Sequence, residues 1–230
     1  MPMRSHSDAR SPAAKSCRPF RVRPFTQKLW AEQDRHPGDR LRLFSAVQEH
    51  IDASTALYPG SFVDVAASFS IPSVTYVDSD RRAQRFFEDP AGVDEIIERH
   101  SSDAAPRSWR FVGGDYTTEI GLADGSFDLL ISLYGGFVSD HCTRYVGPAG
   151  WLLVNPSHGD AALASLDPRY RLDAVVLSRS GAYAISDRDL DRYLVPKRDI
   201  EVTAERVRET GRGIAYTKSP FAYLFQLSAP

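Results

Sequence analysis

Cysteine is almost absent from this sequence, and other informative features are missing with it. Cys17 and Cys142 are the only cysteines in 230 residues, which excludes a disulfide framework and predicts a reducing compartment, the cytoplasm. No apolar run approaches the ~20 residues of a membrane span, and the amino terminus lacks the apolar stretch of a signal peptide. The net charge of −2 favours neither nucleic acid nor an acidic membrane surface. We therefore expect neither a membrane nor a nucleic-acid partner, and oligomeric state is left open.

Motifs for metal binding and nucleophilic catalysis are also missing. The sequence contains no C-x-x-C or H-E-x-x-H pattern, so no metal site is predicted. No Ser-His-Asp order or Cys-His pair has a distinctive spacing. Cys142 is therefore interpreted as a small buried apolar residue.

The chain divides by composition into a tail, an arm and one large domain. Residues 1–24 are rich in Arg, Ser and Pro with a single acid, Asp8, and predict a flexible basic tail, with a transit peptide or an anion-binding arm as the alternative. Residues 25–51 predict a helical arm that either caps a sheet edge or covers a substrate pocket. Residues 52–230 predict one α/β domain, elaborated over about 178–220.

One stretch, Ala56–Asp80, organises the interpretation of this domain. It has an apolar run, a turn at residues 58–61, an apolar segment expected to be helical, and a second apolar run that ends at Asp78. That order is typical of a mononucleotide-binding βαβ unit. Asp78 lies twenty positions after Tyr58 and eighteen after Gly60, close to the ~20 residues that separate such a turn from the acid that binds ribose hydroxyls. An ordinary βαβ unit without a ligand is the alternative.

The rest of the domain alternates predicted strands and helices, which indicates a mostly parallel sheet with right-handed crossovers. The further strands are expected at Trp109–Val112, Phe127–Leu133, Trp151–Val154, Tyr170–Leu177, Ala182–Ile185 and Phe221–Leu227. Helices are expected at Arg81–Glu88, from Pro90 to near His100, and at Gly135–Val146, Asp160–Leu166, Asp187–Leu194 and Val202–Glu209. The caps expected for the first two are Ser79 or Asp80, and Asp89.

Two motifs carry a resemblance to a known family. Gly114-Asp115 leads to LADGSFDLL over residues 122–130, and YVGPAGWLLV follows over residues 145–154. In this order and spacing they resemble the motifs around strands four and five of the class I S-adenosylmethionine-dependent methyltransferases, over roughly residues 56–166. The resemblance implies a Rossmann-like fold of about seven strands, mostly parallel, with helices on both faces.

The resemblance also implies a set of cofactor-binding residues. Asp78 matches the acid that binds both ribose hydroxyls, with Ser79 beside it, and Asp115 matches the acid that accepts from the adenine amino group, with Tyr116 beside the ring. Ser132 and Tyr134 stand at the end of strand four, near the methionine part and the substrate. For Asp78 and Asp115, the capping of a following helix is the alternative role.

The turn after the first strand departs from the family pattern. The family has an acid followed by three glycines, whereas this chain has Tyr58-Pro59-Gly60-Ser61. Gly60 stands near the second glycine, and Tyr58, Gly60 and Ser61 are the expected cofactor-binding residues of the turn. Tyr58 and Phe62 bring side chains where the family has bare backbone near the cofactor. Asp64 is the candidate substitute for the missing acid that receives the methionine ammonium group.

Three residues are candidates for acceptor chemistry. His158 follows the fifth strand, where a neutral imidazole can take a proton from an acceptor hydroxyl, although the start of a helix is the alternative. His141 shares a predicted helical face with apolar residues, which favours a semi-buried histidine over a base. Tyr134 precedes Gly135-Gly136, where a ligand or a plain turn fits equally.

The sequence therefore predicts S-adenosylmethionine-dependent methyl transfer to a small molecule. The alternatives are a non-catalytic relative that binds a nucleoside-like ligand or a partner protein, and a nicotinamide-dependent oxidoreductase. The single glycine of the turn disfavours the oxidoreductase.

Overall fold

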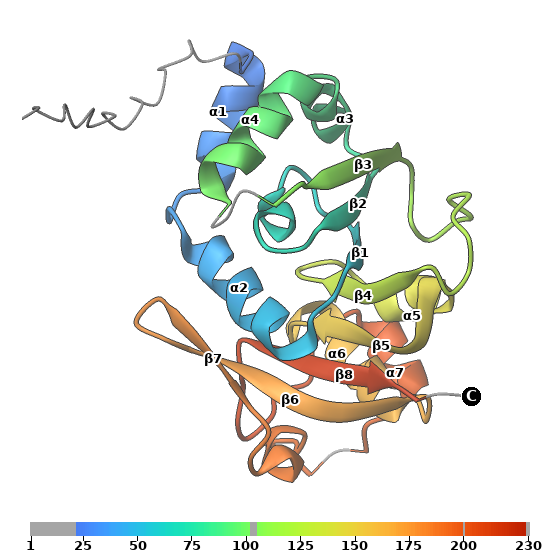
Figure 1. Cartoon of the computed structure of the whole chain (residues 1–230). Coiled ribbons are helices and arrows are strands. Elements are labelled where there is room, and N and C mark those ends of the chain that lie inside the picture. Colours follow the sequence, from blue (N-terminus) through green and yellow to red (C-terminus); the bar gives the residue numbers. More distant parts are fainter. Residues whose placement is uncertain (1–21, 102–104, 200, 229–230) are drawn as a thin grey trace, which may run out of the picture.

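The computed structural model describes residues 22–101, 105–199 and 201–228, which form one sheet with helices on both faces (Figure 1). Residues 1–21 of the predicted tail lie outside the described ranges. The first helix begins at Pro24, within the span predicted as tail. No helix within the described ranges is long and apolar enough to cross a membrane.

The sheet within the described residues has eight strands in the order β3-β2-β1-β4-β5-β8-β6-β7. The strands in chain order are β1 (Thr55–Pro59), β2 (Ser73–Asp78), β3 (Ser108–Gly113), β4 (Phe127–Ser132), β5 (Val146–Val154), β6 (Tyr170–Arg179), β7 (Ala182–Ser186) and β8 (Ala222–Leu227). The first five pair in parallel, and β8 is antiparallel to both β5 and β6. The expectation of a mostly parallel α/β sheet is confirmed, with eight strands among the described residues where about seven were expected. The strand expected at Ala182–Ile185 is β7, an antiparallel edge strand.

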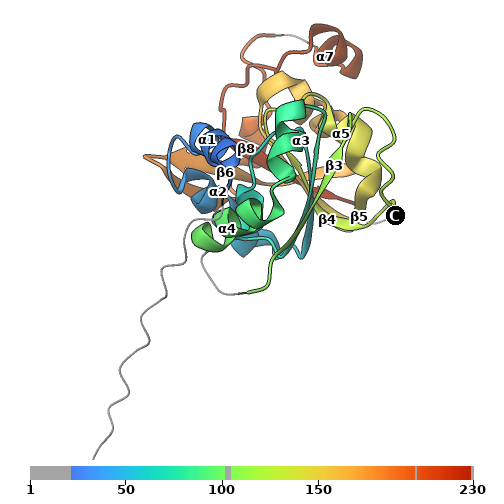
Figure 2. The same ribbon diagram turned by 90° about the horizontal axis from the view of Figure 1, so that it is seen from above.

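Helices cover both faces of this sheet (Figure 2). The α-helices are α1 (Pro24–Gln33), α2 (Asp39–Ile51), α3 (Arg81–Phe87), α4 (Pro90–His100), α5 (Val138–Cys142), α6 (Asp160–Leu166) and α7 (Ala204–Thr210). The short 3-10 turns are η1 (Ala66–Phe69), η2 (Thr143–Tyr145), η3 (Ser157–Gly159) and η4 (Leu190–Tyr193). The caps are as expected, since the Asp80 and Asp89 carboxylates accept N–H groups in the first turns of α3 and α4.

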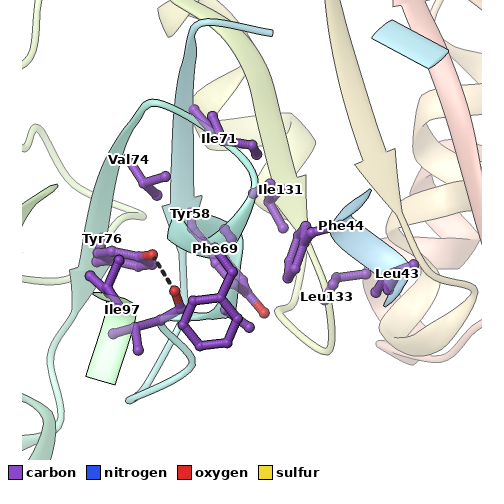
Figure 3. Close-up of a cluster of buried hydrophobic side chains, with 14 of the residues drawn as sticks. Leu43, Phe44, Tyr58, Phe69, Ile71, Val74, Tyr76, Ile97, Ile131 and Leu133 are labelled. Atoms are coloured by element: carbon purple, nitrogen blue, oxygen red, sulfur yellow. Dashed lines mark hydrogen bonds between the residues drawn. The ribbon is translucent and has the colours of Figure 1, made fainter. Parts of the chain in front are cut away.

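Alternating side chains of the strands enter two separate apolar clusters, as the period of two requires. Ala56 and Tyr58 of β1 face the cluster under α1–α4, and Leu57 faces the cluster under α5 and α6. Figure 3 shows the first cluster, where Phe44 of α2 and Phe69 of η1 lie among strand residues. Since each central strand is buried on both faces, its sequence is apolar almost throughout.

The connection between β1 and β2 is not the helix that the sequence predicts. Residues 63–69 are buried on every side, and only η1 forms there. A surface helix needs an exposed polar face, which this segment lacks because its polar residues, Asp64 and Ser68, are buried as well. Its buried backbone is instead satisfied by the Tyr76 hydroxyl, which accepts from the Ser68 N–H at 3.2 Å and donates to the Val65 carbonyl at 3.0 Å.

Two further helices are shorter than predicted. Gly135–Val146 contains only α5 and η2, because Gly135 to Phe137 form an irregular loop first. Asp187–Leu194 contains only η4. The last predicted helix is confirmed as α7, which Thr203 caps and which ends at Gly211 with φ +60°.

Two residues of the motifs that carry the resemblance, Asp128 and Gly150, stabilise the amino edge of the sheet. Asp128 accepts the N–H groups of Ser54 and Thr55 at 2.9 and 2.8 Å, which fastens the start of β4 to the start of β1. A Cβ on Gly150 would lie 2.6 Å from the Val146 side chain, so only glycine fits there. These motif residues therefore have structural roles, away from the strand ends where a ligand would bind.

Candidate functional site

The carboxyl ends of β1, β2, β3 and β4 meet at one edge of the sheet. The chain proceeds from β1 outward to β2 and β3, and then returns to the other side of β1 as β4. The strand order therefore reverses between β1 and β4. Open parallel sheets bind their ligands in the crevice at such a switch point.

Asp78 is the last residue of β2, and its carboxylate connects the turn after β1 to the start of α3. Its Oδ2 accepts the Phe62 N–H at 2.7 Å, and its Oδ1 accepts the Asp80 N–H at 2.8 Å. The carboxylate is half-buried, and each oxygen has a second lone pair for a further donor. Asp78 is thus oriented by the turn after β1, while Ser79 beside it is exposed.

Asp115 lies two residues beyond β3 and is exposed. Its Oδ1 accepts the Thr117 N–H at 2.9 Å and the Thr117 hydroxyl at 2.8 Å. These hydrogen bonds, the backbone N–H first, hold the pKa of Asp115 below its usual value. The group is therefore an anionic acceptor at neutral pH, available to a donor from a ligand.

Tyr116 crosses from the loop after β3 to the loop after β4. Its hydroxyl donates to the Gly136 carbonyl at 2.9 Å and accepts the Gly136 N–H at 3.1 Å. Its ring lies beside the turn after β1, since a Cβ on Gly60 would be 3.5 Å from the Tyr116 Cε1. Burial raises the pKa of this phenol, which stays protonated and neutral.

The turn after β1 contains a polar group without a partner. Gly60 has φ +66°, a conformation that favours glycine, and its N–H donates to the Val77 carbonyl at 2.8 Å. The next residue, Ser61, is 3 % exposed, and its buried Oγ has no hydrogen-bond partner among the described residues. Such an orphan hydroxyl is unusual in a native interior and marks a place where a ligand can supply the missing bond.

Asp64 lies in the interior beside Tyr58 and Arg40. It is 2 % exposed, accepts the Tyr58 hydroxyl at 3.1 Å and the Ala66 N–H at 3.2 Å, and pairs with the Arg40 Nε at 3.5 Å. Burial raises the pKa of Tyr58 well above its usual value. The structure therefore directs the Tyr58 and Asp64 side chains into the interior, and the charge of Asp64 is already compensated. Arg40, on α2, was not singled out from the sequence.

Ser132 ends β4 in a buried polar cluster that the sequence did not reveal. Its Oγ donates to the Asp160 Oδ2 at 2.5 Å, and the Ser139 Oγ donates to the Asp160 Oδ1 at 2.5 Å. Asp160 is fully buried, and burial raises its pKa. The cluster fastens the loop after β4 to the start of α6. The sequence presented Asp160 only as the first residue of that helix.

The three candidates for acceptor chemistry all lie at the surface. Tyr134 is 56 % exposed, and the Arg40 guanidinium lies 5.5 Å from its ring centroid. His141 is exposed because α5 directs Val138 and Cys142 inward, so the expectation of a semi-buried histidine was wrong. His158 is exposed as well. Within the described residues no hydrogen bond joins these three side chains.

Cys142 behaves as predicted, as a small apolar residue. It is buried, and burial raises the pKa of its thiol to about 12, so the thiolate is not formed at neutral pH. Among the residues that the structure describes, no three His, Cys, Asp or Glu side chains gather as a group that could hold a metal ion.

Comparison with solved structures identifies the class of fold. A candidate O-methyltransferase from Klebsiella pneumoniae aligns over 90 % of this chain and 91 % of its own, with a TM-score of 0.50 and 10 % identity. A candidate S-adenosyl-L-methionine-dependent methyltransferase from Methanococcus maripaludis aligns over 94 % and 97 %, with a TM-score of 0.46 and 13 % identity. The O-methyltransferase TomG from Streptomyces achromogenes, solved in complex with S-adenosylmethionine, aligns over 72 % and 88 %, with a TM-score of 0.41 and 10 % identity.

The protein thus has the class I methyltransferase fold that its motifs predict. No protein-family model and no curated sequence matches the chain. Because the sequence identities are so low, the likeness establishes the fold, and the activity has to be argued from the site.

Proposed function

We propose that the protein binds S-adenosylmethionine at the carboxyl edge of β1–β4 and transfers its methyl group to a small molecule. The observation that carries the proposal is the placement of Asp78. Its half-buried carboxylate stands at the end of β2 and is oriented toward the turn after β1 by the Phe62 N–H. An acid in this position is suited to accept the two ribose hydroxyls of a nucleoside.

The surrounding residues fit the nucleoside half of the cofactor. Asp115 is an ionised acceptor for the adenine amino group, at the end of the neighbouring strand. Gly60 lets the backbone approach a ligand, and the orphan Ser61 hydroxyl lacks the partner that a ligand would supply. The fit is poorer at the methionine end, because Asp64 is already paired with Arg40.

The reaction is an in-line displacement at the sulfonium methyl, so the protein mainly orients the reactants and excludes water. Tyr134, exposed beyond β4, is placed to contact the acceptor. His158 and His141 are the candidate bases for an oxygen or nitrogen acceptor, since both imidazoles are exposed. The acceptor is proposed to be a small molecule because the net charge of −2 provides no field for a nucleic acid. A cytoplasmic location remains a prediction.

A second function is favoured by one observation. The Tyr116 side chain lies across the space between the turn after β1 and the loop after β4. A protein that binds only a nucleoside-like ligand, or a partner protein, without methyl transfer would tolerate this arrangement. Calorimetry and a transfer assay together distinguish the two functions.

The test is titration calorimetry with S-adenosylhomocysteine, with NAD as the control ligand. We expect micromolar binding of S-adenosylhomocysteine that both Asp78→Ala and Asp115→Ala abolish, and no binding of NAD. Tritium transfer from labelled S-adenosylmethionine to a panel of small acceptors then separates an enzyme from a binding protein. Well-folded protein that binds neither S-adenosylhomocysteine nor S-adenosylmethionine contradicts the proposal.

A further inference from the structure

Tyr116 lies between the turn after β1 and the loop after β4. A Cβ on Gly60 would lie 3.8 Å from the Gly135 Cα, so the two turns are close together. The Tyr116 ring lies at the same point, and its hydroxyl binds both backbone groups of Gly136. A ligand that spans the crevice from Asp78 toward β4 would therefore contact this side chain.

The anchoring of Tyr116 is local. Its ring packs against the second apolar cluster. Among the described residues, the hydroxyl forms hydrogen bonds only with Gly136, which belongs to an irregular loop. The side chain follows Gly113-Gly114, and a Cβ on Gly114 or Gly136 would meet no atom within 4 Å. The Cα positions of Gly114 and Gly136, close to the contact in the chain, therefore border open space.

We propose that Tyr116 is the residue that controls access of the cofactor to this crevice. In the closed arrangement its hydroxyl holds the loop after β4 against the turn after β1. Binding requires the hydroxyl to leave Gly136, which frees the Gly136 N–H and carbonyl at the place where the ligand enters. The proposal rests on the proposed function, and it adds that the affinity is set partly by the stability of the closed arrangement.

The closed arrangement lowers the apparent affinity by the fraction of molecules that are open. Tyr116→Phe keeps the ring but removes both hydrogen bonds to Gly136, so it destabilises the closed arrangement alone. Each net hydrogen bond changes an equilibrium by a few-fold, so the two together predict roughly 5- to 10-fold tighter binding. A residue that merely packs against the adenine would show no gain in this variant.

The experiment measures S-adenosylhomocysteine binding to the full-length protein, by calorimetry for Kd and by surface plasmon resonance for the association rate. The variants are Tyr116→Phe, Tyr116→Ala and the control Tyr170→Phe. Tyr170 also loses one hydroxyl contact, to Thr143 at 2.8 Å, but it begins β6 at the opposite edge of the sheet. Thermal unfolding of each variant confirms that it is folded.

We expect Tyr116→Phe to bind more tightly and associate faster than the native protein, with Tyr170→Phe unchanged. Binding by the variant when the native protein fails to bind also supports the proposal. If the native protein binds and Tyr116→Phe binds with equal or lower affinity, Tyr116 does not control access of the cofactor, and the proposed function stays intact. If neither the native protein nor any variant binds, Tyr116→Ala included, the proposed function is wrong, and so is the proposed role of Tyr116.

Discussion

At the amino edge of the sheet Asp128 accepts three hydrogen bonds from Ser54 and Thr55, all within the protein. At the carboxyl edge Asp78 accepts two, and the nearby Ser61 hydroxyl accepts and donates none among the described residues. The carboxyl edge also holds bulky residues with positive φ: Phe62 (49°), Tyr134 (65°), Phe137 (52°) and His158 (56°).

This contrast separates structural residues from candidate functional ones. Left-handed backbone costs free energy in residues with a side chain and tends to gather at functional sites. Completed hydrogen bonds at the other edge contribute to the stability of the fold. Substitutions at the carboxyl edge should therefore mainly change ligand binding, and substitutions at the amino edge should mainly change the stability of the fold. The following experiments test this difference.

The largest expected effect is the loss of ligand binding in Asp78→Ala. Removal of a charged acceptor for two ribose hydroxyls should weaken S-adenosylhomocysteine binding roughly 100-fold or more. The matched control is Asp128→Ala, which removes the corresponding carboxylate at the other edge. Equal weakening by both variants in calorimetry would show that the two edges do not differ in this way.

The same Asp128→Ala variant should reduce stability. It leaves the Ser54 and Thr55 N–H groups without their acceptor, at an expected cost of about 2 kcal/mol in the free energy of unfolding. Urea denaturation measures this change. An unchanged midpoint would mean that water replaces the carboxylate at no cost.

Asp160 should make stability depend on pH. Because burial raises its pKa above 3.8, the folded protein holds this proton more tightly than the unfolded chain does. Its contribution is therefore fully present below pH 3.8 and is lost as the pH rises through the folded pKa. Asp160→Asn stays neutral, so the stability of this variant relative to the native protein should improve as the pH rises above 3.8. Urea denaturation at a series of pH values checks the sign, and a constant difference would contradict it.

The smallest expected effect concerns backbone strain. Ala149 near the amino edge has φ +58° and Tyr134 at the carboxyl edge has φ +65°, so glycine should relieve strain at either position by about 0.5–1 kcal/mol. We expect Ala149→Gly to raise the melting temperature without changing methyl transfer, and Tyr134→Gly to lower transfer. If transfer responds equally in both variants, the exposed Tyr134 ring has no role in acceptor binding.

The sequence was sufficient for the sheet and for the strand-end acids, because both depend on local patterns. Continuous apolar runs located the buried strands. The spacing from Gly60 to Asp78 predicted that both residues lie at the carboxyl ends of neighbouring parallel strands, and hence at one edge of the sheet. The predicted helix after β1 was wrong, since an apolar-rich segment does not reveal whether it forms a helix or a buried loop.

The contacts within the site were not predictable, because they join residues far apart in the chain. Tyr116 binds Gly136 across 20 positions, Asp160 binds Ser132 across 28, and Arg40 reaches Asp64 from α2. None of these pairs has a spacing rule, and only the folded topology brings them together.

Helix α2 contacts both the connection between β1 and β2 and the β6–β7 hairpin, which comes much later in the chain. This has a consequence for the order of folding. The helix covers the buried connection between β1 and β2, and it is held in turn by the β6–β7 hairpin, where the Tyr183 hydroxyl donates to Asp39 at 2.9 Å across 144 positions. Contacts of such long sequence separation form late and slow folding. During synthesis the connection that carries Gly60 and Ser61 is therefore not stably covered by α2 until the β6–β7 hairpin holds this helix in place. We expect its amide hydrogens to gain full protection from exchange only after the hairpin has left the ribosome.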